Sequence, residues 1–198
     1  MEHAEKEAKM LNNEIAQRIR RIRQNKGWSL AKLAEKTGFT KSYLSQIENG
    51  KKEPPISTLT RIAHAFEEDV ISLITGEKLK VDNEPFIIVR ANERKVVTRQ
   101  GVASAYTYES LNYKKKDRLM HAYILTSGFK FPEEPLVHEG EEFVYMLEGK
   151  QEVFYDGKTY IVGQGDCFYF ESNRPHYGRS IGDIPAKFIL VYSVREGK

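Results

Sequence analysis

The chain has little of what marks exported or membrane-embedded proteins. Its 198 residues include one cysteine, Cys167, so no internal disulfide can form, which suits a reducing compartment. No apolar run approaches the ~18 residues that a membrane span needs. The first thirteen residues are rich in charge and have no apolar core, so we expect no secretory signal. These absences favour a cytoplasmic protein without a membrane partner.

Net charge is also small, at +3, but it is unevenly distributed along the chain. Between Glu14 and Arg61 there are eleven lysines and arginines and four acids, a net charge of +7. From Glu77 to the C-terminus each sign occurs eighteen times. A basic excess confined to one region suits a polyanion partner, although a basic surface that only meets solvent would give the same count.

The spacing of apolar residues divides the chain into segments. From 14 to 76 they recur at helical intervals, as at Ile15, Ile19 and Ile22. Beyond 76 the sequence pattern changes to short runs of strand-forming residues separated by turn residues, which is typical of a β-barrel or sandwich. The expected strands are 86–89, 106–111, 123–125, 143–147, 153–155, 168–170 and 188–192. We therefore predict an N-terminal extension (1–13), a helical domain (14–76), a linker (77–85) and a β-domain (86–198).

The segment from Ser29 to Gly50 predicts two short helices with a sharp turn between them. Ser29 can cap a helix that runs to about Lys36, and Gly38 suits a break with positive φ. Thr40 can cap the next helix, which the Asn49-Gly50 pair ends.

These two helices have the residues that a helix-turn-helix requires. The steep crossing needs a small residue, a turn glycine and a buried apolar residue, and Ala34, Gly38 and Leu44 supply them. An ordinary helical hairpin in a core is the alternative. With Leu44 and Ile47 buried, the opposite face of the second helix carries hydrogen-bonding side chains: Lys41, Ser42, Ser45, Gln46 and Asn49. Gln46 can pair with adenine, and Lys41 can reach guanine or phosphate.

Residues 15–66 resemble the five-helix DNA-binding domain of the phage-repressor and xenobiotic-response-element family. The resemblance is carried by LSQIENG at 44–50 and LTRIA at 59–63. It implies that Lys41, Ser42 and Gln46 meet base edges. It further implies that the sugar-phosphate backbone is contacted by Thr40, Tyr43, Asn49 and Lys51. Arg23 and Glu48 occupy positions that form a structural pair in similar proteins.

A second group of side chains lies in the β-domain. If His138 and Glu142 belong to one strand, their even separation places both on one face. His176 would complete a set of two histidines and one carboxylate, which suits Fe(II) with open positions. We treat His3, His64 and His121 as structural, and we expect Cys167 to be a small buried side chain.

The stretch from 129 to 192 resembles the cupin family, a double-stranded β-helix barrel. Metal cupins commonly carry a further histidine where this chain has Leu136, so three of four expected ligands remain. The resemblance implies one divalent metal ion, with iron, zinc, manganese and nickel all compatible. A metal-free ligand pocket and a structural remnant are the alternatives. Hydroxypropylphosphonate epoxidase, an iron enzyme, has a similar two-domain layout.

The fold class expected is therefore multidomain α + β, with a five-helix helix-turn-helix domain followed by a cupin barrel. The function expected is a transcription regulator and not an enzyme. A homodimer would place helix 40–49 of each subunit in the major groove of double-stranded DNA, at half-sites about 34 Å apart. The barrel would bind a small-molecule effector. The alternative is a mononuclear non-haem iron oxygenase or epoxidase, and a third possibility is a barrel that serves only dimerisation.

Overall fold

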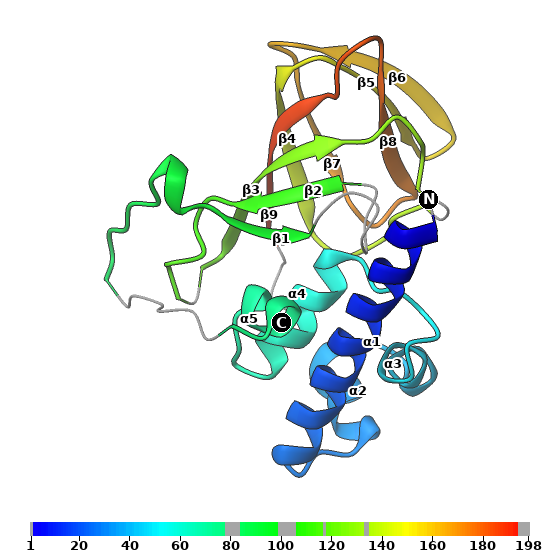
Figure 1. The fold of residues 1–198 in the computed structure, drawn as a ribbon, viewed down its shortest axis with the longest axis vertical. Coiled ribbons are helices and arrows are strands. Elements are labelled where there is room, and N and C mark those ends of the chain that lie inside the picture. The colour runs from blue at the N-terminus through cyan, green and yellow to red at the C-terminus, as the bar shows by residue number, and fades with distance from the viewer. Residues whose placement is uncertain (1, 78–83, 99–105, 117, 133–134, 194–198) are drawn as a thin grey trace. The chain divides into compact units, whose positions relative to one another are not determined.

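The computed structural model describes residues 2–77, 84–98, 106–116, 118–132 and 135–193. The chain forms two compact units, an α-helical one and a β-rich one, which confirms the predicted fold class (Figure 1). The units are Met1–Lys80 and Val81–Lys198. Most of the predicted linker, 77–85, lies outside the described residues. The finer boundaries that we expect stay a prediction.

The described part of the first unit has five helices. They are α1 (Glu2–Asn25), α2 (Leu30–Thr37), α3 (Lys41–Glu48), α4 (Ile56–Ala65) and α5 (Val70–Thr75). Residues 2–13, expected as an extension, are the first turns of α1. None of the helices described has the length and apolarity needed to cross a bilayer. The helices are held by one apolar core, in which Ile19, Leu33, Ile47 and Ile62 are fully buried.

The second unit consists of antiparallel strands in two sheets. The larger sheet has the order β1-β2-β3-β9-β4-β7 and the smaller one β6-β5-β8 (Figure 1). The strands are β1 (Lys95–Thr98), β2 (Tyr106–Ser110), β3 (Met120–Ser127), β4 (Glu141–Glu148), β5 (Lys150–Tyr155), β6 (Lys158–Gly163), β7 (Cys167–Glu171), β8 (His176–Ile181) and β9 (Lys187–Ser193). A short 3-10 helix, η1 (Ala91–Glu93), precedes them. The two sheets form the cupin domain expected from the sequence.

One predicted strand is wrong. Residues 86–89 pair with no strand among the described residues, and β1 begins at Lys95. Phe86 is 78% exposed and Ile88 46% exposed, so this apolar run is not part of the core. Conversely, β6 and β8 are not among the expected strands. The Asp156-Gly157 turn that joins β5 to β6 has positive φ at both residues, 45° and 83°, as the two-residue hairpin turn of this type requires.

A tyrosine joins the two sheets of the β-unit. The Tyr106 hydroxyl on β2 donates to the Gly178 carbonyl at 2.7 Å and accepts from the Gly178 N–H at 2.8 Å on β8. A Cβ at position 178 would lie 2.7 Å from Gln151 Nε2, so glycine leaves the room that this contact uses. Burial raises the pKa of Tyr106 well above its ordinary value, and the hydroxyl stays protonated as a donor.

Candidate functional site: the recognition helix and the His-Glu-His cluster

The turn between α2 and α3 is built by the predicted caps. The Ser29 hydroxyl accepts a hydrogen bond from the Lys32 amide at 3.1 Å, and the Thr40 hydroxyl accepts one from the Tyr43 amide at 3.1 Å. Gly38 closes α2 with a φ of 70°, and its amide donates to the Ala34 carbonyl. These local signals fix the start of both helices, and therefore the angle at which α3 leaves the turn.

Helix α3 buries one face and exposes the other. Leu44 and Ile47 are each 1% exposed. The residues predicted to meet base edges, Lys41, Ser42 and Gln46, are all exposed. Of the other predicted DNA-binding residues, Thr40, Asn49 and Lys51 are exposed, whereas Tyr43 and Ser45 are half-buried. The structure thus brings the predicted set together on and beside one helix.

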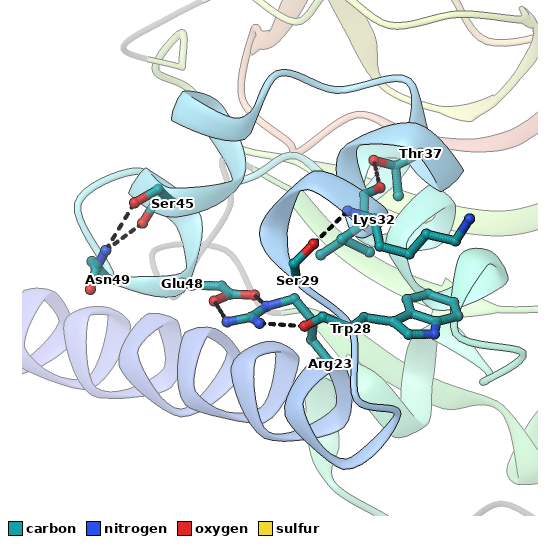
Figure 2. Close-up of polar contacts among 9 residues, drawn as sticks. Arg23, Trp28, Ser29, Lys32, Thr37, Ser45, Glu48 and Asn49 are labelled. Carbon is teal, nitrogen blue, oxygen red and sulfur yellow. Dashed lines mark hydrogen bonds and ion pairs between the residues drawn. The ribbon is translucent and has the colours of Figure 1, made fainter.

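Some of these side chains are engaged within the domain. The Tyr43 hydroxyl lies 3.5 Å from the Thr58 hydroxyl on α4, and its ring packs edge-on against Phe39 with centroids 5.4 Å apart. The side-chain amide of Asn49 donates to the Ser45 carbonyl at 2.7 Å and to the Ser45 hydroxyl at 3.3 Å (Figure 2). Lys52, which the sequence did not single out, lies over the Tyr43 ring at 5.8 Å. Tyr43 and Asn49 are therefore held in fixed positions at the two ends of the helix.

An ion pair connects α3 to α1. The Arg23 guanidinium donates to both carboxylate oxygens of Glu48, at 2.7 and 2.8 Å, and to the Trp28 carbonyl at 2.7 Å (Figure 2). The Arg23 side chain is 11% exposed and that of Glu48 is 4% exposed. The paired carboxylate raises the pKa of Arg23 even though burial opposes its charge. This two-point contact ties the end of α3 to α1 and to the turn after α1.

The three predicted ligands in the cupin domain converge. The donor atoms of His138, Glu142 and His176 lie within 4.8 Å of one another. His138 Nε2 is 2.8 Å from Glu142 Oε1, and His176 Nε2 is 3.9 Å from the same oxygen. Glu142 lies on β4 and His176 begins β8, so the two sheets contribute to one cluster. Of the described residues, no other group of histidines, cysteines and acids meets this spacing.

His138 lies outside β4, although its spacing in the sequence predicts a place on the same strand as Glu142. A bend at Glu139 and Gly140 separates it from the strand, and Gly140 has a φ of 104°. Even spacing on one strand therefore does not explain its position, and that part of the prediction is wrong. The His138 amide instead donates to the Ser172 carbonyl at 2.9 Å, which holds this segment against the chain that follows β7.

Hydrogen bonds to the backbone orient both imidazoles. His138 Nδ1 lies 3.1 Å from the Glu139 carbonyl and His176 Nδ1 lies 2.8 Å from the Arg174 carbonyl, so each Nδ1–H can donate there. That leaves both Nε2 atoms for the centre of the cluster. His176 Nε2 is buried and has no hydrogen-bond partner among the described residues. A buried nitrogen lone pair without a donor is the condition in which a metal ligand is ready to bind.

The two histidines differ in how readily they take up a proton. Burial lowers the pKa of His176. Burial also opposes the charged form of His138, but the hydrogen bond to Glu142, the charge of that carboxylate and the Glu139 carbonyl outweigh this effect, so the pKa of His138 is raised. Proton uptake is therefore disfavoured at His176 and favoured at His138, where Nε2 lies 2.8 Å from the Glu142 carboxylate.

Aromatic rings surround the cluster, and the sequence-based prediction did not include them. The His176 ring lies 4.9 Å from Phe170 and 5.2 Å from His138, and Tyr192 lies 6.3 Å from His138. The only available signal was the alternation Phe168-Tyr169-Phe170, which predicts that the two phenylalanines share a face. Cys167 on the same strand is exposed, which corrects the expectation that it is buried.

Comparison with known proteins agrees with this division. Residues 19–71 match the helix-turn-helix family and residues 124–192 match the cupin domain family. The chain is 36% identical over 107 residues to the HTH-type transcriptional regulator SinR of Bacillus subtilis (strain 168), a match that spans 51% of this chain and 92% of SinR. It is 28% identical over 161 residues to the HTH-type transcriptional regulator PuuR of Escherichia coli (strain K12), spanning 80% of this chain and 83% of PuuR. The chain therefore belongs to the helix-turn-helix transcriptional regulators, and it carries a cupin domain after the DNA-binding domain.

Two solved structures align with most of this chain. An HTH_3 family transcriptional regulator from Vibrio cholerae aligns with a TM-score of 0.59 at 24% identity, over 96% of this chain and 99% of its own. Hydroxypropylphosphonic acid epoxidase from S. wedmorenis aligns over 91% of this chain and 97% of its own at 23% identity. Its TM-score of 0.45 is too low to support a conclusion about this chain. The Vibrio cholerae structure supports the fold and nothing finer.

Proposed function

We propose that this transcriptional regulator reads DNA with the exposed face of α3 and responds to a small-molecule effector bound through a divalent metal ion in the cupin domain. One face of α3 exposes three hydrogen-bonding side chains, Lys41, Ser42 and Gln46. Side chains of these types can bind base edges in the major groove of DNA. Backbone contacts come from Thr40, Tyr43, Asn49 and Lys51. Ser45, which is half-buried, supports Asn49.

The observation that carries the effector site is the state of His176. Its Nδ1 is committed to a backbone carbonyl and its Nε2 is buried without a partner, 3.9 Å from a carboxylate oxygen. A buried polar atom left in this way costs free energy unless something binds it. Two imidazoles and one carboxylate are donors that iron, zinc, manganese and nickel all accept, and they leave positions for further ligands. A bound ion would supply positive charge at which an effector's oxygen or nitrogen donors can bind.

The test uses the full-length protein and DNA from upstream of its own gene. We expect purified protein to bind one divalent ion per chain, measured by elemental analysis after dialysis. His138→Ala and His176→Ala should remove that ion, whereas His64→Ala, at an exposed position on α4, should retain it. All three variants should still select the same DNA. Full metal occupancy in a His138→Ala, His176→Ala double variant would rule out the proposed ligand set.

We also propose that the protein acts as a homodimer in the cytoplasm. The outer face of the larger sheet exposes three aromatic side chains, Phe143, Tyr145 and Tyr169, and the last is 61% exposed. Phe143 and Tyr169 are directly opposite each other on β4 and β7, so they form one patch. An exposed apolar patch of this kind suits contact with a second copy. Light scattering should give twice the chain mass of 22.9 kDa, and Tyr169→Lys should shift it toward the monomer.

The His-Glu-His cluster also favours a second candidate function, an iron-dependent oxygenase or epoxidase. The same three donors can hold iron for oxygen chemistry. In that case the iron-loaded protein should consume oxygen or peroxide with a substrate present, and it should show no preference among DNA sequences. Sequence-selective DNA binding with no consumption of either oxidant would support the regulator alone.

A further inference from the structure

Two phenylalanines on β7 face the inside of the cupin domain but remain reachable by solvent. Phe168 lies opposite Val144 and Phe170 lies opposite Glu142 on the β4–β7 ladder, so each pair shares a face of the sheet. Val144 and Glu142 are buried, whereas Phe168 and Phe170 are only half-buried. The difference arises because β7 is the outer strand of its sheet. Both phenylalanines therefore keep part of their surface accessible to solvent on the inner face.

The smaller sheet adds a further aromatic side chain beside these two phenylalanines. The Tyr155 hydroxyl on β5 donates to the Glu171 carbonyl at the end of β7, at 3.1 Å, and so spans the two sheets. Its ring lies 5.4 Å from that of Phe170, which in turn stacks on Phe168 at 6.0 Å with an angle of 17° between the planes. We refer to Tyr155, Phe168 and Phe170 as the aromatic rim.

The aromatic rim is in contact with the His-Glu-His cluster. The Phe170 ring centroid is 4.9 Å from that of His176. A molecule bound to an ion at the cluster on the side of β7 would therefore lie beside the Phe170 ring. The charge of the site sets the other requirement, because a divalent ion beside one carboxylate and two neutral imidazoles keeps a net charge of +1. That charge favours a ligand with one negative oxygen donor group.

From these two requirements we propose that the effector is an aromatic carboxylate, with its carboxylate on the metal ion and its ring against the aromatic rim. The inference rests on the metal site proposed above and adds the chemical class of the ligand. An aliphatic cation would meet a positive charge at the cluster. A small aliphatic acid would satisfy that charge but leave the rim uncovered.

The experiment uses the full chain loaded with Co(II), with benzoate, cyclohexanecarboxylate and acetate as probes. Binding is measured by titration calorimetry and by the visible absorption of Co(II), which reports a change of its ligands. We expect benzoate to bind about three- to tenfold more tightly than cyclohexanecarboxylate, because ring-on-ring packing adds to the shared carboxylate contact. Acetate should bind more weakly than both, since it buries no ring-sized apolar surface.

Two leucine variants test the aromatic rim, and a third serves as the control. Phe170→Leu and Phe168→Leu should each reduce the preference for benzoate over cyclohexanecarboxylate. Phe168→Leu should do so without changing the affinity for Co(II). The Phe168→Leu variant separates an effect on the rim from an effect on the cluster, because the Phe170 ring packs against His176 whereas the Phe168 ring stacks on Phe170. Phe154→Leu is the matched control, because Phe154 precedes Tyr155 on β5, points to the other face of that strand and stacks on Tyr177. It should leave all three affinities unchanged.

Different failures have different meanings. If Co(II) binds and depends on His138 and His176, but benzoate binds no better than acetate, the inference about the effector is wrong and the metal site stands. The effector inference is equally wrong if both Phe168→Leu and Phe170→Leu keep the full preference for benzoate. If the wild-type chain binds no Co(II), both the metal site and the inference are overturned. DNA selectivity, measured separately, is affected by none of these outcomes.

Discussion

Removing Glu48 should destabilise the DNA-binding domain far more than removing an exposed acid. Glu48 accepts two charge-assisted hydrogen bonds from Arg23, and its side chain is 4% exposed. After Glu48→Ala the Trp28 carbonyl is the guanidinium's remaining hydrogen-bond partner among the described residues, and the Arg23 side chain is only 11% exposed in the wild type. Breaking a buried pair costs about 3–5 kcal/mol, and the remaining access of Arg23 to water reduces this. We expect a loss of about 2–4 kcal/mol in the free energy of unfolding.

The interaction itself is isolated by a double-mutant cycle with Arg23→Ala. The double variant leaves no unpaired charge, so it should be less destabilised than the two single changes together, with a coupling of about 1.5–3 kcal/mol. Trp28, the only tryptophan, reports on this domain because its ring lies 5.8 Å from the core residue Phe66. Urea unfolding followed by Trp28 fluorescence therefore measures the free energy of unfolding of the helical unit.

The matched control is the pair Lys32–Glu35 on α2. It has the same 2.7 Å separation, but its side chains are 43% and 66% exposed. A cycle with Lys32→Ala and Glu35→Ala should show no resolvable coupling, because exposed pairs contribute little. A coupling below about 0.5 kcal/mol for Arg23 and Glu48, within the error of additivity, would refute the claim that this pair holds α3 to α1.

Three further predictions concern the DNA, the cupin core and the metal. Gln46→Ala should reduce the free energy of binding to the preferred DNA by about 1–3 kcal/mol and relax selection at one base pair. Lys51→Ala should instead weaken binding to all sequences and lower the slope of log affinity against log salt concentration by about one. Fluorescence anisotropy across a salt series measures both. Tyr106→Phe should reduce the free energy of unfolding of the cupin domain by about 1–3 kcal/mol, because the Gly178 N–H and carbonyl lose the hydroxyl that they bind. Calorimetry measures this change, and an unchanged melting temperature would contradict it. Metal affinity should fall as pH drops, because protons compete for the histidines. Since the pKa of His138 is raised and that of His176 lowered, the fall should begin above the ordinary histidine pKa of about 6.5. A metal affinity that stays constant down to that pH would exclude His138 as the competing group.

The helical domain could be predicted closely because its signals are local. A cap such as Ser29 or Thr40 acts on an amide three residues away, and Gly38 needs only its own φ. The sequence beside α2 and α3 therefore contains the cap that starts each of these two helices. The strands were harder to predict, because a strand depends on its partner. Residues 86–89 have suitable composition and no partner strand in the described part of the chain, whereas Lys158–Gly163 is polar in part but pairs with β5 along its whole length.

The metal cluster shows how a correct set of residues can follow from an incorrect geometry. Even spacing would place His138 and Glu142 on one face of a continuous strand, but the strand begins only at Glu141 and Gly140 turns the chain before it. What brings His138 to Glu142 is pairing with distant segments: Leu136 forms an antiparallel bridge with His176, and the His138 amide bonds to Ser172. Residues directly opposite each other in such a bridge share a face. Leu136, at the place where metal cupins commonly carry a histidine, thus lies on the same side as His176 and offers no donor there. Contacts between segments far apart in sequence determine where the three remaining donors and the aromatic rings around them lie. Spacing along the chain could therefore identify the ligands but not the way in which they come together.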